Sequence, residues 1–380
     1  MKEQIAFLYM NTGGGHIAPA RALEKEINRL FPDDCGTVLH HGFSERMKAS
    51  RFFFEDGYRL TTNYFESGYV LFYRMTAWPI AIHFGNYLIS VHGITDLIRF
   101  FRSNNITKVV CLHEVLILIT RAALDAVDPS IPLITVVTDP YTAHGLWFYE
   151  KRNNLVVFSE KLRTEAIEKH GFPEDRLHVF PFILSRKFDQ PYTEEEKRLA
   201  RERLGFPQDG KILLVAGGGE GLKKADRLVS RFADDERSET LVVVCGKNSI
   251  LRRRVEAIAE SKRAKNIRVY GFVPFMCDLV NIADCVITKG GASTVMEVLA
   301  AKKPVIFSTF IRGQEWGNVL FAVNSGAGWH LTKPRQILDK AYEILEDSSL
   351  REKIRSRIDR LALRNGLEEV ARFIHSFKKG

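Results

Sequence analysis

The chain has 380 residues, of which 45% are hydrophobic and 27% are charged, a composition that excludes an intrinsically disordered protein. No run approaches the ~20 apolar residues that a membrane-spanning helix needs, and the first residues lack the apolar core and cleavage site of a signal peptide. The formal net charge of +9 predicts an anionic partner, for which nucleic acid, an anionic lipid surface and a nucleotide diphosphate all qualify.

Two features of the composition narrow these classes. The five cysteines include no C-x-x-C pair and lie mostly in apolar runs, which predicts reduced core thiols in a cytoplasmic protein and indicates neither a zinc site nor a disulfide framework. The densest basic region, 252–265, contains no interleaved aromatic residues. We therefore interpret it as a solvated helix face and expect no nucleic-acid partner.

Short β-branched runs alternate with helical segments along the chain, and this alternation predicts parallel sheets of an α/β fold. The predicted strands are Ile5 to Met10, Val109 to Leu112, Leu133 to Thr138, Leu155 to Phe158, Ile212 to Ala216, Leu241 to Cys245, Ile267 to Tyr270, Cys285 to Thr288 and Val305 to Ser308. The pattern stops between Phe188 and Gly210, where a charged helix-like stretch and turn residues intervene. We predict an N-terminal domain over 1–188, a second domain over 189–360, and a helical segment over 361–380 that packs back toward the N-terminal domain.

The first predicted strand runs into Gly13-Gly14-Gly15 and then a helix from about His16 to Leu30. This arrangement places backbone N–H groups and a positive helix end where α/β folds bind ligands, with His16 projecting into the crevice. A tight turn with an exposed histidine explains the same residues equally well. A dinucleotide oxidoreductase is disfavoured, because the second strand region offers His40 and His41 where that fingerprint has an acidic residue.

Three glycine turns follow strands in the second half: 217–221, 246–248 and 290–291. After the last of these a helix begins with Ser293 and Thr294, so a diphosphate is expected at its N-terminus. Glu297, one to two turns into that helix, suits the two hydroxyls of a ribose. The polar loop 312–318 has the amide and carboxylate side chains that a sugar site requires, although a surface turn is the simpler explanation for that loop alone.

The order and density of these motifs resemble the inverting GT-B glycosyltransferases that include the monogalactosyldiacylglycerol synthases, the processive diacylglycerol glucosyltransferases and the peptidoglycan lipid-intermediate GlcNAc transferase. The similarity to the galactolipid synthases is greatest in the second half, in the segments 217–221, 244–248, 271–273, 287–291 and 313–318. In the first half, 13–16 resembles the acceptor-side loop, and Thr138-Asp139-Pro140 with His144 and Trp147 resembles the interdomain T-D segment. The resemblance implies two Rossmann-like domains, with the donor in the C-terminal one.

The expected donor site comprises residues of five loops and one helix. They are Gly218, Gly219, Glu220, Gly246, Lys247, Asn248, Phe272, Val273, Gly291, Ser293, Thr294, Glu297, Gln314, Glu315 and Asn318. By the resemblance, Phe272 and Val273 flank the uracil, Glu297 holds the ribose, and Gln314 and Glu315 contact sugar hydroxyls. The chain departs from the family's motifs at two places. The family's Gly-Pro-Gly-Thr is Gly291-Ala292-Ser293-Thr294 here, and the family's Pro-Ile/Val-Arg-Pro corresponds to 181–186, with an insertion.

The expected acceptor side comprises Gly14, Gly15, His113, His144 and Trp147. His16 is the candidate general base, because an imidazole titrates near neutrality, and Asp139 either orients it or is itself the base. Between Arg51 and Ser90 lie 12 aromatic residues mixed with arginines, a composition that suits either a lipid interface or a buried helical subdomain. The helix N-terminus at 293–294 can stabilise departing UDP, so we expect no catalytic metal and no cofactor besides the UDP-sugar.

The predicted activity is therefore inverting transfer of a hexose from a UDP-sugar to a lipid, with diacylglycerol as acceptor, on the cytoplasmic face of an anionic membrane surface. Three alternatives stay open. One is GlcNAc transfer to an isoprenoid-linked cell-wall intermediate or another acceptor. The others are nonhydrolysing epimerisation of a UDP-sugar, and a catalytically silent sensor of lipid or nucleotide.

Overall fold

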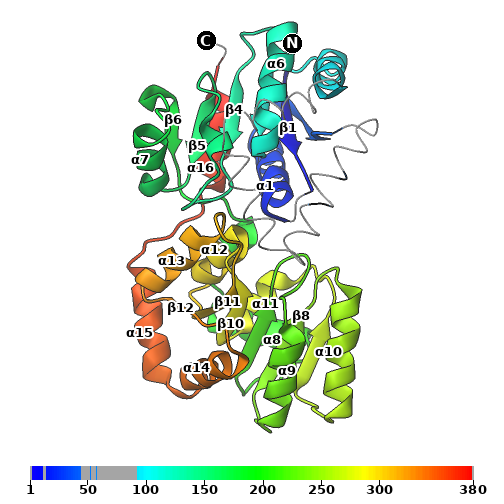
Figure 1. Cartoon of the computed structure of the whole chain (residues 1–380), viewed down its shortest axis with the longest axis vertical. Helices are drawn as coiled ribbons and strands as arrows, with labels where there is room; N and C mark the ends of the chain where they lie inside the picture. The colour runs from blue at the N-terminus through cyan, green and yellow to red at the C-terminus, as the bar shows by residue number, and fades with distance from the viewer. Residues whose placement is uncertain (1, 12–13, 44–51, 53–56, 58–91, 379–380) are drawn as a thin grey trace. The chain divides into compact units, whose positions relative to one another are not determined.

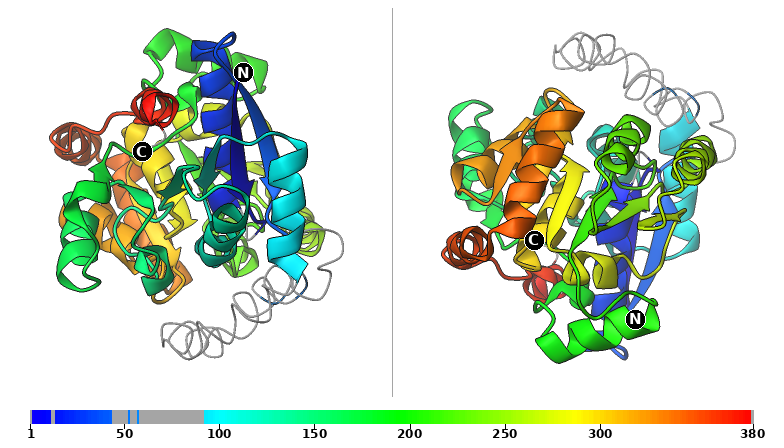
Figure 2. Two further views of the ribbon diagram at one scale, coloured as in Figure 1. Left: turned by 90° about the horizontal axis from the view of Figure 1, so that it is seen from above. Right: turned by 90° about the horizontal axis from the view of Figure 1, so that it is seen from below.

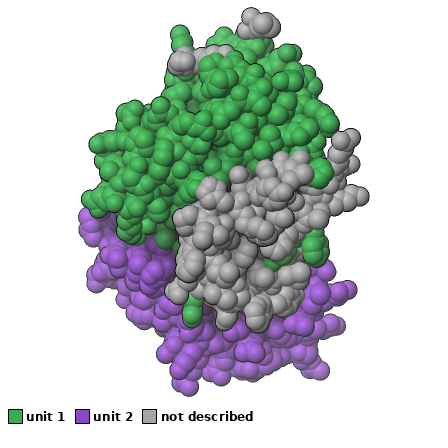
Figure 3. All heavy atoms as spheres, turned by 45° about the horizontal axis from the view of Figure 1, so that its top comes forward, with its two compact units in different colours: residues 1–185, 312–314, 365–380 green, residues 186–311, 315–364 purple. Residues whose placement is uncertain are grey.

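The computed structural model describes the chain except for residues 1, 12–13, 44–51, 53–56, 58–91 and 379–380 (Figure 1). The chain divides into two compact units (Figure 3). Unit 1 comprises 1–185, 312–314 and 365–380, and unit 2 comprises 186–311 and 315–364. No helix among the described residues is both long and apolar enough to cross a bilayer.

Unit 1 is built on a six-stranded parallel sheet in the order β2-β1-β3-β4-β5-β6. The strands are β1 (Glu3–Tyr9), β2 (Cys35–His41), β3 (Lys108–Cys111), β4 (Leu133–Val136), β5 (Asn154–Val157) and β6 (Leu177–Val179). The connecting helices are α1 (Gly14–Leu30), helical residues 92–103, α6 (Ile117–Val127) and α7 (Glu160–Glu168), and α16 (Leu367–Ser376) closes the unit. The direction of winding reverses between β1 and β3, which is where an open α/β sheet forms its ligand crevice.

Unit 2 repeats this plan with the order β12-β11-β10-β7-β8-β9. Its strands are β7 (Ile212–Ala216), β8 (Thr240–Val244), β9 (Ile267–Tyr270), β10 (Cys285–Lys289), β11 (Val305–Thr309) and β12 (Gly328–His330). Its helices are α8 (Glu194–Arg203), α9 (Ala225–Asp234), α10 (Ser249–Ser261), α11 (Met276–Ile282), α12 (Ala292–Ala300), α13 (Trp316–Asn324), α14 (Pro334–Glu346) and α15 (Ser348–Asp359). Winding reverses between β7 and β10, so both units contain a switch point.

The apolar runs at the centre of each sheet form strands that are covered on both faces. β3, β4 and β7 are buried along their whole length, as continuous β-branched runs in parallel sheets require. Figure 2 gives two further views of these strands and their helices. All five cysteines are free and buried, in agreement with core thiols. The α/β class and the paired Rossmann-like architecture predicted from the sequence are confirmed.

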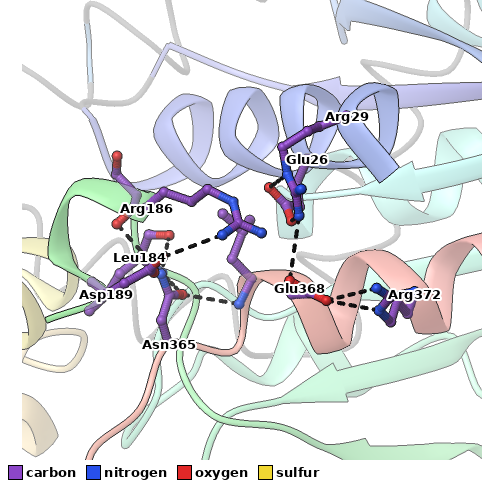
Figure 4. Close-up of polar contacts among 10 residues, drawn as sticks. Glu26, Arg29, Leu184, Arg186, Asp189, Asn365, Glu368 and Arg372 are labelled. Carbon is purple, nitrogen blue, oxygen red and sulfur yellow. Dashed lines mark hydrogen bonds and ion pairs between the residues drawn. The ribbon is translucent and has the colours of Figure 1, made fainter. Parts of the chain in front are cut away.

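The last helix belongs to unit 1 and packs on α1 (Figure 4). Arg29 of α1 forms ion pairs with Glu26 of its own helix at 2.8 Å and with Glu368 of α16 at 3.5 Å. The Asn365 side chain accepts from Leu184 N at 2.9 Å and donates to Leu184 O at 3.0 Å, which fixes the chain where it re-enters the unit.

A buried lysine joins α16 to the sheet. Lys108 on β3 is fully buried, and its Nζ donates to the carbonyls of Ile374 and His375 at 2.7 and 2.9 Å and pairs with Glu3 at 3.0 Å. A cation suits this position because the last carbonyls of a helix have no partner within it.

The periodicity of Ser349 to Lys379 predicts helix throughout, and here the prediction is wrong, because α15 and α16 are separate. Ala362 adopts a left-handed conformation with φ of 47°, which ends a helix. A Cβ at Gly366 would lie 1.9 Å from Pro181 O, so the chain passes this point only with a glycine. The aromatic segment 51–90 lies outside the described residues, apart from 52 and 57.

Candidate functional site

The glycine turn after β7 is packed tightly against the turn after β8. A Cβ at Gly246 would lie 2.2 Å from Gly219 O, and a Cβ at Gly217 would lie 2.3 Å from Gly221 O. Lys247 N donates to Gly219 O at 2.7 Å, which ties the two turns together. Gly219 itself faces open space on its Cβ side. These glycines therefore let two loops meet at the sheet edge while leaving a backbone surface accessible to a ligand.

At the end of β10 the chain turns through Gly290 and Gly291 into α12. No side chain caps this helix, so the first-turn amides, including those of Ser293 and Thr294, receive no side-chain cap hydrogen bond. Such an N-terminus carries partial positive charge and N–H groups directed at the sheet edge. Because β7 and β10 are neighbours, α12 and the 217–221 turn lie at the same switch point. The arrangement suits a diphosphate.

Glu297 lies on α12 behind those amides and is half-buried. No residue in the described part of the chain forms a hydrogen bond or ion pair with its carboxylate. Burial raises the pKa of Glu297 from 4.5 to about 7. A half-buried carboxylate without a partner can accept hydrogen bonds from a ligand, and two vicinal hydroxyls are donors of the required kind.

The loop before α13 holds its polar side chains within the protein. Lys289 Nζ pairs with Glu315 Oε1 at 2.5 Å, and Ile311 N donates to Glu315 Oε2 at 2.8 Å. Asn318 donates to Gly290 O at 2.9 Å. Thus Glu315 and Asn318 already shape the glycine turn. Gln314, which clusters with unit 1, donates to Asp139 Oδ2 at 3.3 Å.

The remaining predicted donor residues lie on neighbouring loops of unit 2. Asn248 caps α10 by accepting from Leu251 N at 2.9 Å, and it donates to Glu220 O at 3.4 Å. Phe272 follows β9 and is 69% exposed, which is unusual for so large an apolar ring, while Val273 is half-buried. An exposed aromatic face beside a phosphate cradle is available for stacking on a base.

In unit 1, His16 lies in the first turn of α1, after the exposed Gly14 and Gly15. Its Nδ1 is 2.7 Å from Leu112 O and 3.1 Å from Thr138 Oγ1. A carbonyl only accepts, so Nδ1 carries the proton and Nε2 presents its lone pair. Burial and the neighbouring His113 lower the pKa of His16 to about 4, which keeps the ring neutral at physiological pH.

The end of β3 brings His113 and Glu114 to His16, because β1 and β3 are adjacent strands. The His16 and His113 rings lie 4.4 Å apart between centroids, and Trp147 lies 6.3 Å from His16. His144 caps the short helix that carries Trp147 by accepting from Leu146 N at 3.2 Å.

Sequence reasoning missed Glu114, Thr138 and Lys289 as site residues. Thr138 and Lys289 lie inside segments already recognised as motifs, but Glu114 is linked to His16 only by the strand order.

Comparisons with known proteins match both halves of the chain. Residues 16–181 match the model for monogalactosyldiacylglycerol (MGDG) synthase, and residues 212–361 match the glycosyltransferase family 28 C-terminal domain. A probable monogalactosyldiacylglycerol synthase 2 of Oryza sativa subsp. indica is 27% identical, covering 88% of this chain and 72% of that protein. A processive diacylglycerol beta-glucosyltransferase of Bacillus licheniformis is 25% identical, covering 97% and 93%.

Solved structures give the fold. MurG of Acinetobacter baumannii covers 99% of this chain and all of its own, with a TM-score of 0.64 and 15% identity. The chain is a glycosyltransferase with the GT-B fold. It is related over nearly its whole length to monogalactosyldiacylglycerol synthases and to a diacylglycerol glucosyltransferase, which confirms the resemblance found in its motifs.

Proposed function

We propose that the chain transfers a hexose from a UDP-sugar to a lipid acceptor, with inversion at the anomeric carbon, and that the acceptor is diacylglycerol. The observation that carries the donor assignment is the unpartnered Glu297 carboxylate behind the uncapped N-terminus of α12. The amides bind the diphosphate and Glu297 accepts from both ribose hydroxyls. The acceptor assignment rests on relatives of both kinds, galactolipid synthases and a diacylglycerol glucosyltransferase.

In the proposed reaction the acceptor hydroxyl donates a hydrogen bond to His16 Nε2. As its oxygen attacks the anomeric carbon from one face, the proton passes to Nε2 and UDP leaves from the opposite face. The amides of α12 and the 217–221 turn stabilise the charge that develops on the departing diphosphate, so no catalytic metal or further cofactor is assigned. The Leu112 carbonyl and Thr138 orient the imidazole.

Asp139 is the second candidate for the base. The Asp139 carboxylate is buried and already accepts a hydrogen bond from Gln314. The contacts of His16 with Leu112 and Thr138 both use Nδ1, so Nε2 keeps its lone pair for the acceptor. These contacts favour His16. Asp139→Asn and His16→Ala variants separate the two roles: the variant that loses turnover while it retains UDP affinity identifies the base.

We further propose that the protein acts as a peripheral protein on the cytoplasmic face of a membrane. The net charge of +9 supports attraction to anionic phospholipid, and a diacylglycerol acceptor resides in a bilayer. Flotation with vesicles that contain or lack anionic lipid tests this, since charge-driven binding weakens as salt is added.

The test of the activity is incubation of the purified chain with diacylglycerol vesicles and UDP-galactose or UDP-glucose labelled in the sugar. Label in a glycolipid, lost in His16→Ala and kept in the exposed His92→Gln control, supports the proposal and identifies the sugar. Label confined to water with no UDP released contradicts the diacylglycerol assignment. Transfer to an isoprenoid-linked acceptor, conversion of the UDP-sugar without acceptor, or UDP binding without turnover would then identify the cell-wall, epimerase or sensor alternative.

A further inference from the structure

The switch point of unit 1 gathers three side chains of a kind that bind transition metals. One ligand atom from each of His16, His113 and Glu114 lies within 4.8 Å of the other two. Both imidazoles are buried, and Glu114 is half-buried. His16 lies in the first turn of α1, the helix after β1, and His113 and Glu114 follow β3, which is the neighbour of β1 in the sheet.

Two details of the cluster match a metal site. His16 donates from Nδ1 to the Leu112 carbonyl at 2.7 Å, the outer hydrogen bond that metal-binding histidines use to fix their tautomer, and this leaves Nε2 as the ring nitrogen with a lone pair for a ligand. Glu114 Oε2 is buried and has no hydrogen-bond partner among the described residues. It is 3.6 Å from His113 Nδ1, which accepts a long hydrogen bond from Val115 N at 3.3 Å. One cation bonded at about 2.0–2.2 Å to both atoms can bridge the 3.6 Å separation, and it would take the place of the Val115 hydrogen bond.

We propose that His16, His113 and Glu114 form a binding site for Zn²⁺. Two imidazoles and one carboxylate with an open fourth position suit a borderline-soft divalent cation rather than Mg²⁺ or Ca²⁺, which prefer oxygen ligands. Bound zinc occupies the Nε2 lone pair that accepts the acceptor proton, so zinc inhibits transfer. The binding of zinc does not depend on the proposed function, whereas the inhibition of sugar transfer rests on it.

The experiment measures metal binding without activity. Untagged, metal-free full chain is titrated with Co²⁺, a spectroscopic substitute whose visible absorption reports a four-coordinate site, and Zn²⁺ is added to displace it. Glu114→Gln removes one of the three ligands, so the dissociation constant for Co²⁺ rises at least about tenfold. Loss of a residue that only hydrogen-bonds to a metal ligand already weakens metal binding by about this factor. The exposed His92→Gln is the matched control and binds as the wild type does.

X-ray absorption of the zinc-loaded wild type gives a readout that does not depend on how a variant folds. We expect a shell of nitrogen and oxygen with imidazole scattering. A sulfur shell would assign the metal to cysteines and overturn the proposal, as would failure to bind one Co²⁺ per chain or equal binding by Glu114→Gln. Cobalt bound as expected by a protein that transfers no sugar leaves the site established and refutes the proposed function instead.

Discussion

Replacing Glu297 by Gln separates two effects that one carboxylate exerts on unit 2. The folded protein raises the pKa of this group from 4.5 to about 7 by burial. If UDP-sugar binds the ionised form, the dissociation constant at pH 6 is about tenfold larger than at pH 8, because only about a tenth of the molecules are ionised at pH 6. UDP-glucose is the appropriate ligand, since its phosphates are diesters that do not titrate in this range.

The glutamine variant loses this pH dependence and binds more weakly at pH 8. Exchanging charge-assisted hydrogen bonds for neutral ones costs about 1–2 kcal/mol, or roughly 5- to 30-fold in affinity. Its stability changes in the opposite direction. A carboxyl whose folded pKa lies above its unfolded value stabilises the fold most below pH 4.5, and this contribution is lost as the pH rises through 7, about 3 kcal/mol for 2.5 pKa units.

The ligand-free glutamine variant should therefore melt at a higher temperature than the wild type at pH 8, with the difference shrinking toward pH 4.5. Calorimetric titration with UDP-glucose and thermal melts across this range measure both effects, with the exposed Glu260→Gln on α10 as control. A glutamine variant that retains the tenfold pH dependence would refute the role of Glu297 in binding the ribose.

Three further predictions concern other contacts. His16→Ala lowers kcat about 10²- to 10⁴-fold without changing UDP affinity. Because the pKa of His16 is about 4 in the wild type, wild-type kcat at saturating donor stays level down to about pH 5. A fall in kcat centred near neutrality would contradict this. Gly246→Ala abolishes UDP binding because its Cβ would lie 2.2 Å from Gly219 O. Gly205→Ala is also at positive φ, but its Cβ would meet only Arg268 Nη1 at 3.9 Å, so it costs about 1 kcal/mol of stability. Equal losses of melting temperature and of UDP affinity in the two variants would count against the packing argument. Lys108→Met removes the donor to two carbonyls of α16, so the free energy of opening α16 should fall by about 1–3 kcal/mol. Hydrogen exchange of the α16 amides measures this opening. Protection equal to that of the wild type would exclude Lys108 as the residue that holds α16 on the sheet.

The sequence predicts the fold well where the signal is local. Every predicted strand corresponds to a strand of the structure, because buried parallel strands are continuous apolar runs bounded by turns. Three described strands are absent from the predicted list. β2 was recognised only as the strand region of His40 and His41, and β6 and β12 are three-residue edge strands, too short to leave such a pattern. The break between α15 and α16 was also missed, since it depends on the close approach of Gly366 to Pro181, far away in the chain.

The candidate site is predictable in part for the same reason. Glu297 and the turn before α12 are neighbours in sequence, so helix geometry alone relates them. Glu114 and His16 are about a hundred residues apart, and only the strand order β2-β1-β3 makes them neighbours. Likewise, the sequence presents Glu315 as a carboxylate for sugar hydroxyls, whereas its pairing with Lys289 depends on two loops meeting.

Unit 1 is discontinuous in the chain, and this has a consequence for how the protein is made. Its sheet is synthesised first, but α16, which covers α1 and accepts the buried Lys108, is translated after all of unit 2. During synthesis unit 2 can complete its core from one stretch of chain, broken only by 312–314, while unit 1 still exposes the apolar surface that α16 will cover. A ribosome that stalls after residue 364 would thus hold one finished unit and one unfinished unit, and the unfinished one carries His16.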